Sequence, residues 1–423
     1  MASVDVKSLQ DLVGGAKRAG AVLRSMPAGR KNAALHDMAD ALVRRTDEIL
    51  RENALDVADA KAAHRPGAMV DRLMLDEDRV MAMARGIRDV AALPDPVGEV
   101  DSGWRLPNGL EVIRKRVPLG VIAVVYEGRP NVTSDAAALC LKSGNAIVLR
   151  GSSIARRSNG IIADVLAHAL IEADVPAEAI VSVAGDHDQL RELVQLKSLI
   201  DLVVPRGGEE LKAFLMEHAQ VPVIYAASGN NHVYVHADAD VAKAVKITVN
   251  AKVQRPGVCN AAETLLVHRD AAAEFLPLAG KALTGAGVQL RICDATRAVL
   301  GDAAADMPVA TDDDFATEFL DLRMAVRVVD TLGEAVEHVD RYGSGHSEAI
   351  VTRSIEAARE FEAGVDAACV YVNASTRFTD GGEFGMGAEI ANSTQKLHAR
   401  GPLGLRELTT MKYVVTGDGH VRT

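Results

Sequence analysis

The chain has 423 residues, of which 48% are hydrophobic and 25% charged, a balance typical of a folded globular protein with two or three domains. Its formal net charge is −11, so the chain as a whole repels the phosphate backbone of nucleic acids. Aromatic residues make up only 3% of it, which leaves few surfaces on which bases could stack. Nucleic-acid binding is therefore not expected.

Nothing in the sequence indicates a membrane protein or a metalloprotein. Residues Met1–Leu12 include Asp5 and lack the apolar stretch of a signal peptide. The longest apolar run, Val117–Tyr126, is far shorter than a bilayer span. The four cysteines form no CxxC pair and the histidines are scattered, so neither a disulfide framework nor a metal site is indicated. We expect a protein of the reducing cytoplasm.

Residues 7 to 95 are predicted to form helices, because apolar residues recur at helical spacing, as at Leu35, Met38 and Leu42. The next segment, 98–117, has the turn sequence Leu106-Pro-Asn-Gly109 between two short runs, which predicts a β-hairpin. Its second arm is basic, and its edge would either be solvated or pair with another subunit.

From residue 119 to 225, short apolar runs alternate with helical stretches. This alternation predicts a parallel sheet covered by helices on both faces, with a ligand site beyond the carboxyl ends of its strands. The predicted strands are 121–126, 146–149, 180–183, 200–204 and 223–225, and the predicted helices are 134–142, 158–173, 188–195 and 209–220.

A second α/β unit is predicted in the remainder of the chain. Its strands are 264–267, 324–329, 349–351 and 369–372, and its helices are 241–252, 270–283, 332–342 and 355–363. The acidic residues Asp312–Asp314 are expected in an exposed loop. The tail beyond Asn373 is rich in turn residues and is expected to end in a short strand at 412–415.

Two glycine-rich segments are candidates for binding an anion. Gly207 and Gly208 join a predicted strand to a helix whose N-terminal N–H groups suit a phosphate, although the spacing is not that of a GxGxxG motif. An ordinary tight turn is the alternative. The loop 377–387 could wrap a small anionic substrate, with Arg377 as a fork for a carboxylate or phosphate, or be an ordinary surface loop.

Cys259 is the candidate nucleophile. It lies in a predicted loop with Lys252 and Arg255 close by in sequence, and cationic neighbours favour the thiolate form. The alternative is a buried, inert cysteine. Cys140 and Cys369 lie among apolar residues and are predicted to belong to the core.

Taken together, five segments in this order resemble the aldehyde dehydrogenase superfamily. They are Arg116–Asn131, Val249–Asn260, Tyr371–Gly382, Phe384–Glu389 and Ser393–Pro402. The resemblance extends over essentially the whole chain. Within the superfamily, the chain is most similar to the enzymes that reduce γ-glutamyl phosphate to glutamate 5-semialdehyde, the second step of proline biosynthesis from glutamate.

The resemblance implies an aldehyde dehydrogenase-like α/β fold, with two parallel-sheet α/β domains for cofactor and catalysis and a small β oligomerisation flap. The cofactor-binding domain would comprise residues 1–99 and 119–232, and the catalytic domain residues 233–405. The hairpin 100–118 and the strand 406–423 would form the flap of a homo-oligomer, in keeping with the exposed edge of the hairpin.

The resemblance also implies a mechanism. Cys259 matches the family nucleophile, whose thiolate would attack the acyl carbon of γ-glutamyl phosphate, expel phosphate and leave a thioester for reduction by NADPH. Asn131 is the candidate side-chain donor to the oxyanion, and Arg255 and Arg377 are the candidate substrate-binding residues. A glutamate kinase would supply the labile substrate, so a transient contact with it would fit, but the sequence shows no separate docking segment.

For the cofactor, the resemblance places residues of both predicted units. The implied cofactor-binding residues are Arg150, Ser152, Gly207, Gly208 and Glu318. The 2′-phosphate of NADPH would find a cation among Arg150, Arg156 and Arg157. Family members usually have Gly-Gly-Lys at positions 151–153, where this chain has Gly-Ser-Ser.

One absence favours reduction over hydrolysis. Hydrolytic members carry a glutamate base well before the cysteine, and the corresponding segment 223–232 contains no carboxylate. Without a base to activate water, a thioester is spared for hydride or phosphate. Two alternatives remain, a non-phosphorylating aldehyde dehydrogenase for another small aldehyde and a non-catalytic nucleotide-binding oligomer with an inert Cys259.

Overall fold

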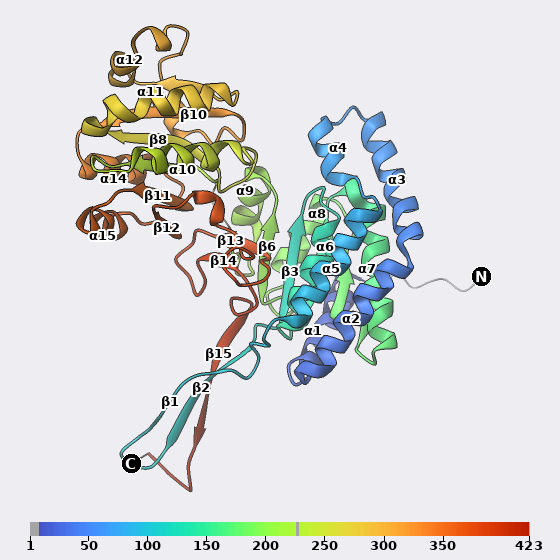
Figure 1. Ribbon diagram of the computed structural model, residues 1–423. Helices are drawn as coiled ribbons and strands as arrows, with labels where there is room; N and C mark the ends of the chain where they lie inside the picture. Colours follow the sequence, from blue (N-terminus) through green and yellow to red (C-terminus); the bar gives the residue numbers. More distant parts are fainter. Residues whose placement is uncertain (1–7, 226–227, 423) are drawn as a thin grey trace. The chain divides into compact units, whose positions relative to one another are not determined.

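The computed structural model describes residues 8–225 and 228–422, in which the chain forms two compact units (Figure 1). The first unit comprises the described residues up to Tyr225, Gly385–Ala391, and the chain from Leu403 onward, and the second comprises Ser228–Phe384 and Asn392–Pro402. This division differs from the predicted one in placing Gly385–Ala391 and residues 403–405 in the first unit, and the roles assigned to the domains stay predictions. Residues 1–7 of the segment Met1–Leu12, and residues 226–227 of the segment 223–232, lie outside the described residues.

The first unit begins with helices, as predicted for residues 7–95. The first of them is capped by Ser8, whose hydroxyl accepts the N–H of Asp11 while the Asp11 carboxylate accepts the N–H of Ser8, a capping box. The predicted stripe of Leu35, Met38 and Leu42 is fully buried. The helices are α1 (Leu9–Leu23), α2 (Ala28–Arg44), α3 (Thr46–Ala62), α4 (Gly67–Leu73) and α5 (Glu77–Ala92).

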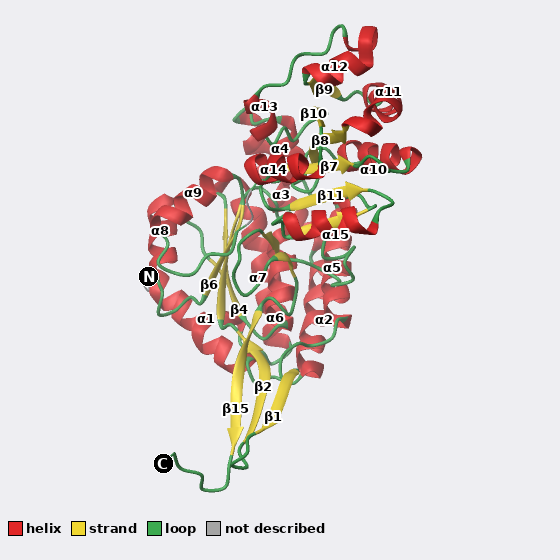
Figure 2. Cartoon of the chain, turned by 90° about the vertical axis from the view of Figure 1, so that its left-hand side faces the viewer, coloured by secondary structure: helices red, strands yellow, loops and turns green. Residues whose placement is uncertain are grey.

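The centre of the first unit is a parallel sheet with the strand order β5-β4-β3-β6. Its strands are β3 (Val121–Tyr126), β4 (Ala146–Gly151), β5 (Ile180–Ser182) and β6 (Leu202–Arg206), and its helices are α6 (Asn131–Lys142), α7 (Arg156–Glu172), α8 (His187–Gln195) and α9 (Glu209–His218). Helices α6 and α7 lie on one side of the sheet, and α1, α8 and α9 on the other (Figure 2). This arrangement confirms the predicted two-sided sheet.

The strand order reverses between β3 and β6. From β3 the chain proceeds through β4 to β5 on one side, and then returns to place β6 on the other side of β3. In open α/β sheets, ligands bind beyond the carboxyl ends of the strands at such a point. The two chain segments that meet there are Glu127–Gly128 and Gly207–Gly208.

A three-stranded antiparallel sheet, which we call the flap, extends from the first unit (Figure 1). It contains the predicted hairpin, β1 (Val100–Arg105) and β2 (Glu111–Pro118), and the chain turns between them with Gly109 at a φ of 95°. The C-terminal strand β15 (Thr409–Thr416) pairs with all of β2 and is longer than the predicted strand 412–415.

The second unit is built on a six-stranded parallel sheet with the order β12-β11-β7-β8-β10-β9. Its strands are β7 (Asn231–Val235), β8 (Ala262–His268), β9 (Gln289–Ile292), β10 (Arg323–Val329), β11 (Ser347–Val351) and β12 (Cys369–Val372), and its helices are α10 (Val241–Val253), α11 (Arg269–Gly285), α12 (Asp294–Leu300), α13 (Asp312–Ala316), α14 (Leu332–Tyr342) and α15 (Ile355–Gly364). A short pair of strands, β13 (Ala391–Ser393) and β14 (Gly401–Leu403), crosses the division between the units.

The core of the second unit forms on both faces of its sheet because strand side chains alternate. On β7, Val233 and Val235 pack with α10 and α11, whereas Tyr234 packs with α14 and α15 on the opposite face. All five residues of β7 are buried, including the polar Asn231 and His232 at its amino end. The amino end of β7 is therefore both polar and buried.

Two sequence predictions were wrong in detail. Val223–Tyr225 forms only an isolated bridge between Val223 and Val203, because the run is short and Pro222 has no N–H to donate. The acidic residues 312–314 begin the helix α13 instead of lying in a loop, because Thr311 and Asp314 form a capping box and Asp314 is buried.

Candidate active site

Cys259 lies between α10 and β8, at the amino end of the parallel sheet of the second unit. Its side chain is exposed, as expected for a nucleophile and unlike a buried structural thiol. The connection is short, because α10 ends at Val253 and β8 begins at Ala262. We refer to residues 254–261 as the cysteine loop.

A buried ion pair joins the two ends of the cysteine loop. Lys252 in the last turn of α10 places its Nζ 2.5 Å from the Oε2 of Glu263 on β8, and both side chains are fully buried. Burial raises the pKa of Glu263 to about 7 and lowers that of Lys252, while their mutual attraction opposes both shifts. Breaking a buried pair costs roughly 3–5 kcal/mol, so this pair holds the loop ends together.

The main chain of Cys259 lies against residues 228–230, the segment that leads into β7. A Cβ built on Gly229 would lie 1.7 Å from the Cys259 carbonyl oxygen, so only glycine permits this approach. The carboxamide of Asn231 donates to that same carbonyl at 2.9 Å. Two residues of one segment therefore hold one peptide of the cysteine loop.

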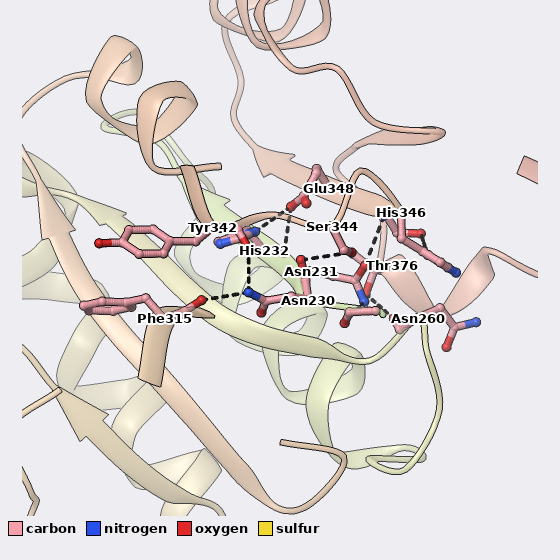
Figure 3. A network of polar contacts seen from close by, with 12 residues as sticks. Asn230, Asn231, His232, Asn260, Phe315, Tyr342, Ser344, His346, Glu348 and Thr376 are labelled. Atoms are coloured by element: carbon pink, nitrogen blue, oxygen red, sulfur yellow. Dashed lines mark hydrogen bonds and ion pairs between the residues drawn. The ribbon is translucent and has the colours of Figure 1, made fainter. Parts of the chain in front are cut away.

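A short helical turn after β12, Thr376–Phe378, is hydrogen-bonded to the cysteine loop. The hydroxyl of Thr376 donates to the Asn260 carbonyl at 2.7 Å, and the Asn260 side chain donates to the Thr379 carbonyl at 2.9 Å (Figure 3). Asn260, Thr376 and Thr379 are all buried, so these hydrogen bonds are shielded from water and join the two segments firmly. They bring Arg377, from the predicted glycine-rich loop, to the cysteine.

The two predicted substrate-binding arginines lie together with Cys259. The Nε of Arg377 donates to the Oε1 of Gln254 at 2.8 Å, which fixes the guanidinium against the cysteine loop. Partial burial lowers the pKa of Arg377, as does the neighbouring positive charge of Arg255, whereas Cys259 raises it. Positive charge beside a sulfur favours its thiolate form, and a guanidinium is suited to a carboxylate or phosphate, so the substrate-binding role of these arginines stays a prediction.

Glu318 also belongs to this cluster. One of its carboxylate oxygens accepts the N–H of Gly229 at 2.7 Å, so the residue is attached to the segment that supports Cys259. The structure therefore brings together Cys259, Arg255, Arg377 and Glu318, four of the nine predicted site residues.

Behind the cluster lies a chain of hydroxyl groups. Thr379 forms hydrogen bonds with the Ser347 hydroxyl at 2.6 Å and the Tyr371 hydroxyl at 2.7 Å, and Ser347 contacts the Nδ1 of His346 at 2.7 Å. Burial lowers the pKa of His346 to about 4, so this imidazole is neutral at physiological pH. The predicted residues do not include any member of this chain.

A second buried histidine lies deeper in the unit. Glu348 on β11 accepts both the main-chain N–H of His232 at 2.7 Å and a contact from its Nδ1 at 2.9 Å, and both side chains are fully buried (Figure 3). Burial raises the pKa of Glu348. The ring centroid of His338 lies 5.4 Å from that of His232, in an edge-to-face arrangement.

The other predicted cofactor-binding residues lie in the first unit, at the carboxyl ends of its strands. Gly208 donates its N–H to the Oε2 of Glu127 at 3.2 Å, and Gly128 donates its N–H to the Ser152 hydroxyl at 3.2 Å. These bonds join the ends of β6, β3 and β4 around the point where the strand order reverses. Glu127 is a functional candidate that sequence reasoning missed.

Gly208 and Arg150 lie at the start of α9 and near the carboxyl end of β4, and their cofactor-binding roles stay predictions. Gly208 is the N-cap of α9, and no atom lies within 4 Å of the place where its Cβ would stand, so the chain leaves open space on that side of the helix N-terminus. Arg150 donates to the carbonyls of Gly185 and Asp186, at 3.1 and 3.2 Å, and so lies at the edge between β4 and the start of α8.

Asn131 occupies the first position of α6, in the first unit. Its side-chain N–H group donates to the Oδ2 of Asp135 at 2.9 Å, one helical turn away. Burial raises the pKa of Asp135 to about 6. Asn131 and Cys259 lie in different units, and the oxyanion role of Asn131 stays a prediction.

Comparison with known proteins places this site in a family. The aldehyde dehydrogenase family model matches residues 1–298, well over half of the chain. The chain belongs to the aldehyde dehydrogenase family. Within this family, its relatives include the gamma-glutamyl phosphate reductase of Thermoanaerobacter pseudethanolicus, 50% identical over 99% of each chain.

Two further family members agree. The gamma-glutamyl phosphate reductase of Heliobacterium modesticaldum is 54% identical over 96% of this chain and 97% of that one. The crystal structure of gamma-glutamyl phosphate reductase from Thermotoga maritima is 45% identical and superposes with a TM-score of 0.96, covering 99% of this chain and 100% of that one. The predicted superfamily and fold are confirmed.

The remaining cysteines of this aldehyde dehydrogenase are structural. Cys140 is buried, which raises its pKa, and Cys369 is buried, so both predictions of a core position are confirmed. Cys293 caps α12, where its sulfur accepts the N–H of Thr296. Within the described ranges 8–225 and 228–422, no three ligand-type side chains gather as a metal site, and no helix is long and apolar enough to cross a membrane.

Proposed function

We propose that the chain is an NADPH-dependent γ-glutamyl phosphate reductase, which forms glutamate 5-semialdehyde and phosphate in proline biosynthesis. The observation that carries the proposal is the exposed Cys259 thiol beside the guanidinium of Arg377. The near-complete match to relatives of that name supports the same substrate.

In the first step, the Cys259 sulfur forms a bond to the acyl carbon while the bond from that carbon to the phosphate oxygen breaks. Phosphate leaves with the electron pair and needs little acid assistance, because it is a good leaving group. The positive charges of Arg377 and Arg255 stabilise the thiolate and attract the anionic ends of the substrate. The product of this step is a thioester on Cys259.

In the second step the thioester is reduced. NADPH, when bound, supplies the hydride for the acyl carbon. Gly207 and Gly208 would hold its pyrophosphate, Arg150 and Ser152 its adenosine half, and Glu318 its nicotinamide ribose. The carbon–sulfur bond then breaks, the sulfur of Cys259 recovers the electron pair, and the aldehyde departs.

The cysteine loop favours these two steps over hydrolysis. The lead-in to β7 corresponds to the segment where hydrolytic members carry their glutamate base, and segment 223–232 has no carboxylate. Water near the thioester therefore lacks a positioned base to accept its proton. The same thioester can be attacked by phosphate in the reverse direction.

The test uses the reverse reaction. Purified protein is given glutamate 5-semialdehyde, which equilibrates with its cyclic form, and NADP⁺, and the absorbance of the reduced cofactor is followed with and without phosphate. We expect steady reduction only with phosphate, and no reduction by the Cys259→Ala variant. The control is Cys293→Ala, which removes a helix cap and leaves the reacting sulfur in place.

Each outcome of this experiment is decisive. Reduction at the same steady rate without phosphate would identify a non-phosphorylating aldehyde dehydrogenase. Full activity of Cys259→Ala would remove Cys259 from the mechanism. No reduction with either nicotinamide cofactor would overturn the assigned reaction.

We also propose that the flap joins this chain to further copies of itself in the cytoplasm. Its strands β1 and β15 are both edge strands, and Trp104, Tyr413 and Val415 are 47%, 57% and 56% exposed. Exposed edges and apolar side chains of this kind favour strand addition by a partner. A transient contact with a glutamate kinase stays a prediction.

We expect the double substitution Tyr413→Asp with Val415→Asp to lower the molar mass measured by light scattering to that of one chain. Two carboxylates on this face would have to be desolvated in any flap interface. The matched control is Val421→Asp, at an 83% exposed position beyond β15. An unchanged mass in the double variant would exclude the flap as the interface.

A further inference from the structure

The main-chain carbonyl of Cys259 is a point at which the candidate nucleophile can be controlled from outside the cysteine loop. The thiol itself is exposed. The carbonyl, in contrast, faces the buried amino end of β7 and accepts a hydrogen bond there. The direction of the Cα–Cβ bond of Cys259 depends on how this peptide is held.

The side chain of Asn231 holds that peptide. Its amide nitrogen lies 2.9 Å from the Cys259 oxygen, 2.8 Å from the Gly229 oxygen and 2.7 Å from the Ala261 oxygen. Its amide oxygen accepts the N–H of Ser347 on β11 at 3.1 Å. The side chain is fully buried, so it has no water with which to exchange these bonds.

The position of Asn231 in the sheet explains its reach. It is the first residue of β7, which lies between β8 and β11, and a register shift separates Asn231 from His232. The carboxamide can therefore join the chain entering β8, on one side, to the first residue of β11 on the other. The Asn231 side chain therefore links the Cys259 carbonyl to β7, to the chain entering β8 and to β11.

The close packing of Gly229 against the Cys259 carbonyl makes the position of this peptide sensitive to changes in its neighbours. Because a Cβ at Gly229 would collide with the Cys259 carbonyl, the loop lies directly against the lead-in to β7. A planar trans peptide also fixes the Asn260 N–H on the side opposite to the Cys259 oxygen. Releasing the carbonyl would allow the whole peptide, and the sulfur with it, to rotate.

We propose that Asn231 is a positioning residue for Cys259, acting through the main-chain carbonyl of the cysteine. The inference rests on the proposed function only in that Cys259 is the nucleophile. Its effect is on the reactivity of the sulfur and on the chemical step, because Asn231 is buried beneath the loop and contacts its main chain. Small displacements of a reacting group reduce rates steeply.

The neighbouring Asn230 provides a matched control. It is 2% exposed, and its amide nitrogen donates to the carbonyls of Phe315 and Tyr342, each at 2.7 Å (Figure 3). It thus has the same side chain, the same burial and the same kind of acceptors. Its side-chain bonds go to other segments than the cysteine loop.

The experiment compares Asn231→Ala, Asn231→Ser and Asn230→Ala with the wild-type protein. The first readout is the rate at which iodoacetamide alkylates Cys259, measured from pH 6 to pH 9 by mass spectrometry of the peptide containing Cys259. The second is the separation of kcat from KM in the phosphate-dependent reverse reaction. Thermal melting reports the loss of stability, and all rates are measured well below the lowest melting temperature.

For Asn231→Ala we expect a displaced pH profile of alkylation and a fall in kcat of about tenfold or more, with KM within about twofold. Asn231→Ser keeps one donor and should retain an intermediate kcat. Asn230→Ala should melt at a lower temperature but keep the wild-type pH profile and kcat. These results would separate positioning from general stability.

The inference is overturned if Asn231→Ala and Asn230→Ala share the wild-type pH profile and kcat. If Asn231→Ala does not fold, Asn231→Ser decides, and a wild-type profile and kcat in that variant refutes the inference. The proposed function fails separately, through activity of Cys259→Ala. Alkylation does not require substrate or cofactor, so it tests the positioning independently of the reaction.

Discussion

A cysteine becomes a useful nucleophile when positive charge lies near its sulfur and its backbone is held in place. At the candidate nucleophile Cys259, positive charge comes from Arg377, which has Arg255 as its neighbour, and the main chain is held by Gly229 and Asn231. Gly229, Asn231 and Arg255 precede Cys259 in the sequence, and Arg377 follows it. The arginine contact with Gln254 joins a residue to one 123 positions away.

At the residue scale, we predict that Arg377→Ala raises KM for phosphate or for the semialdehyde about ten- to hundredfold. The loss of a charge-assisted hydrogen bond costs roughly 1.5–3 kcal/mol, which corresponds to that range. Steady-state kinetics of the reverse reaction measure the change. Arg353→Ala, at an exposed arginine paired with Asp240, should leave both KM values unchanged. Unaltered KM values in Arg377→Ala would remove this residue from the substrate site.

Residues with distinctive chemistry could be predicted from the sequence, and those that act by close packing could not. Cys259, Arg377 and Glu318 could be named as candidates because their residue types and surrounding motifs suggest roles, and the structure places them in one cluster, while the roles themselves stay predictions. Asn231 and Glu127 were missed because an asparagine or glutamate at a strand end has many uses. Their importance depends on which distant carbonyl or N–H the fold brings to them.

At the element scale, the lead-in to β7 and the cysteine loop function as one packed layer. We predict that Gly229→Ala lowers the free energy of unfolding by about 1–3 kcal/mol, the usual cost of overpacking, and largely abolishes kcat. The added methyl group would collide with the Cys259 carbonyl. Denaturant unfolding and the reverse assay measure the two effects.

The control for this substitution is Gly285→Ala at the end of α11. No atom lies within 4 Å of the Cβ position at Gly285, so alanine should be tolerated there with wild-type kcat. If Gly229→Ala were as stable and active as wild type, the cysteine loop would not rest on this segment.

Strands with long continuous apolar runs could be predicted, whereas a strand with a polar end could not. The strand 121–126 was predicted with its observed bounds, because six consecutive apolar residues are buried there. Strand β7 was missed because it begins with Asn231 and His232. The burial of His232 is stabilised by Glu348, which lies 116 residues later on the neighbouring strand.

At the scale of the whole molecule, buried neutral histidines make the fold sensitive to acid. Burial lowers the pKa of His346 to about 4, while an unfolded histidine titrates near pH 6.5. The unfolded chain therefore binds more protons between these values, and stability falls as pH falls through them. We predict a loss of about 2 kcal/mol from this histidine between pH 7 and pH 5.

Denaturant unfolding at several pH values tests this prediction. His346→Gln removes the titrating ring, so its unfolding free energy should decline less steeply between pH 6.5 and pH 4 than that of the wild-type protein. His168→Gln, at an exposed position, should follow the wild-type curve. Equal slopes in all three proteins would show that His346 is not the neutral group in question.

The central claim, that Cys259 carries the acyl group of the substrate and that water does not remove it, can be tested in a single turnover. The protein is mixed with glutamate 5-semialdehyde and NADP⁺ in the absence of phosphate, and both the reduced cofactor and the intact mass of the protein are measured. We predict a rapid burst of about one NADPH per site, then no further turnover, with one γ-glutamyl group on Cys259. Continued turnover without phosphate, or a burst that leaves Cys259 unmodified, would contradict the claim.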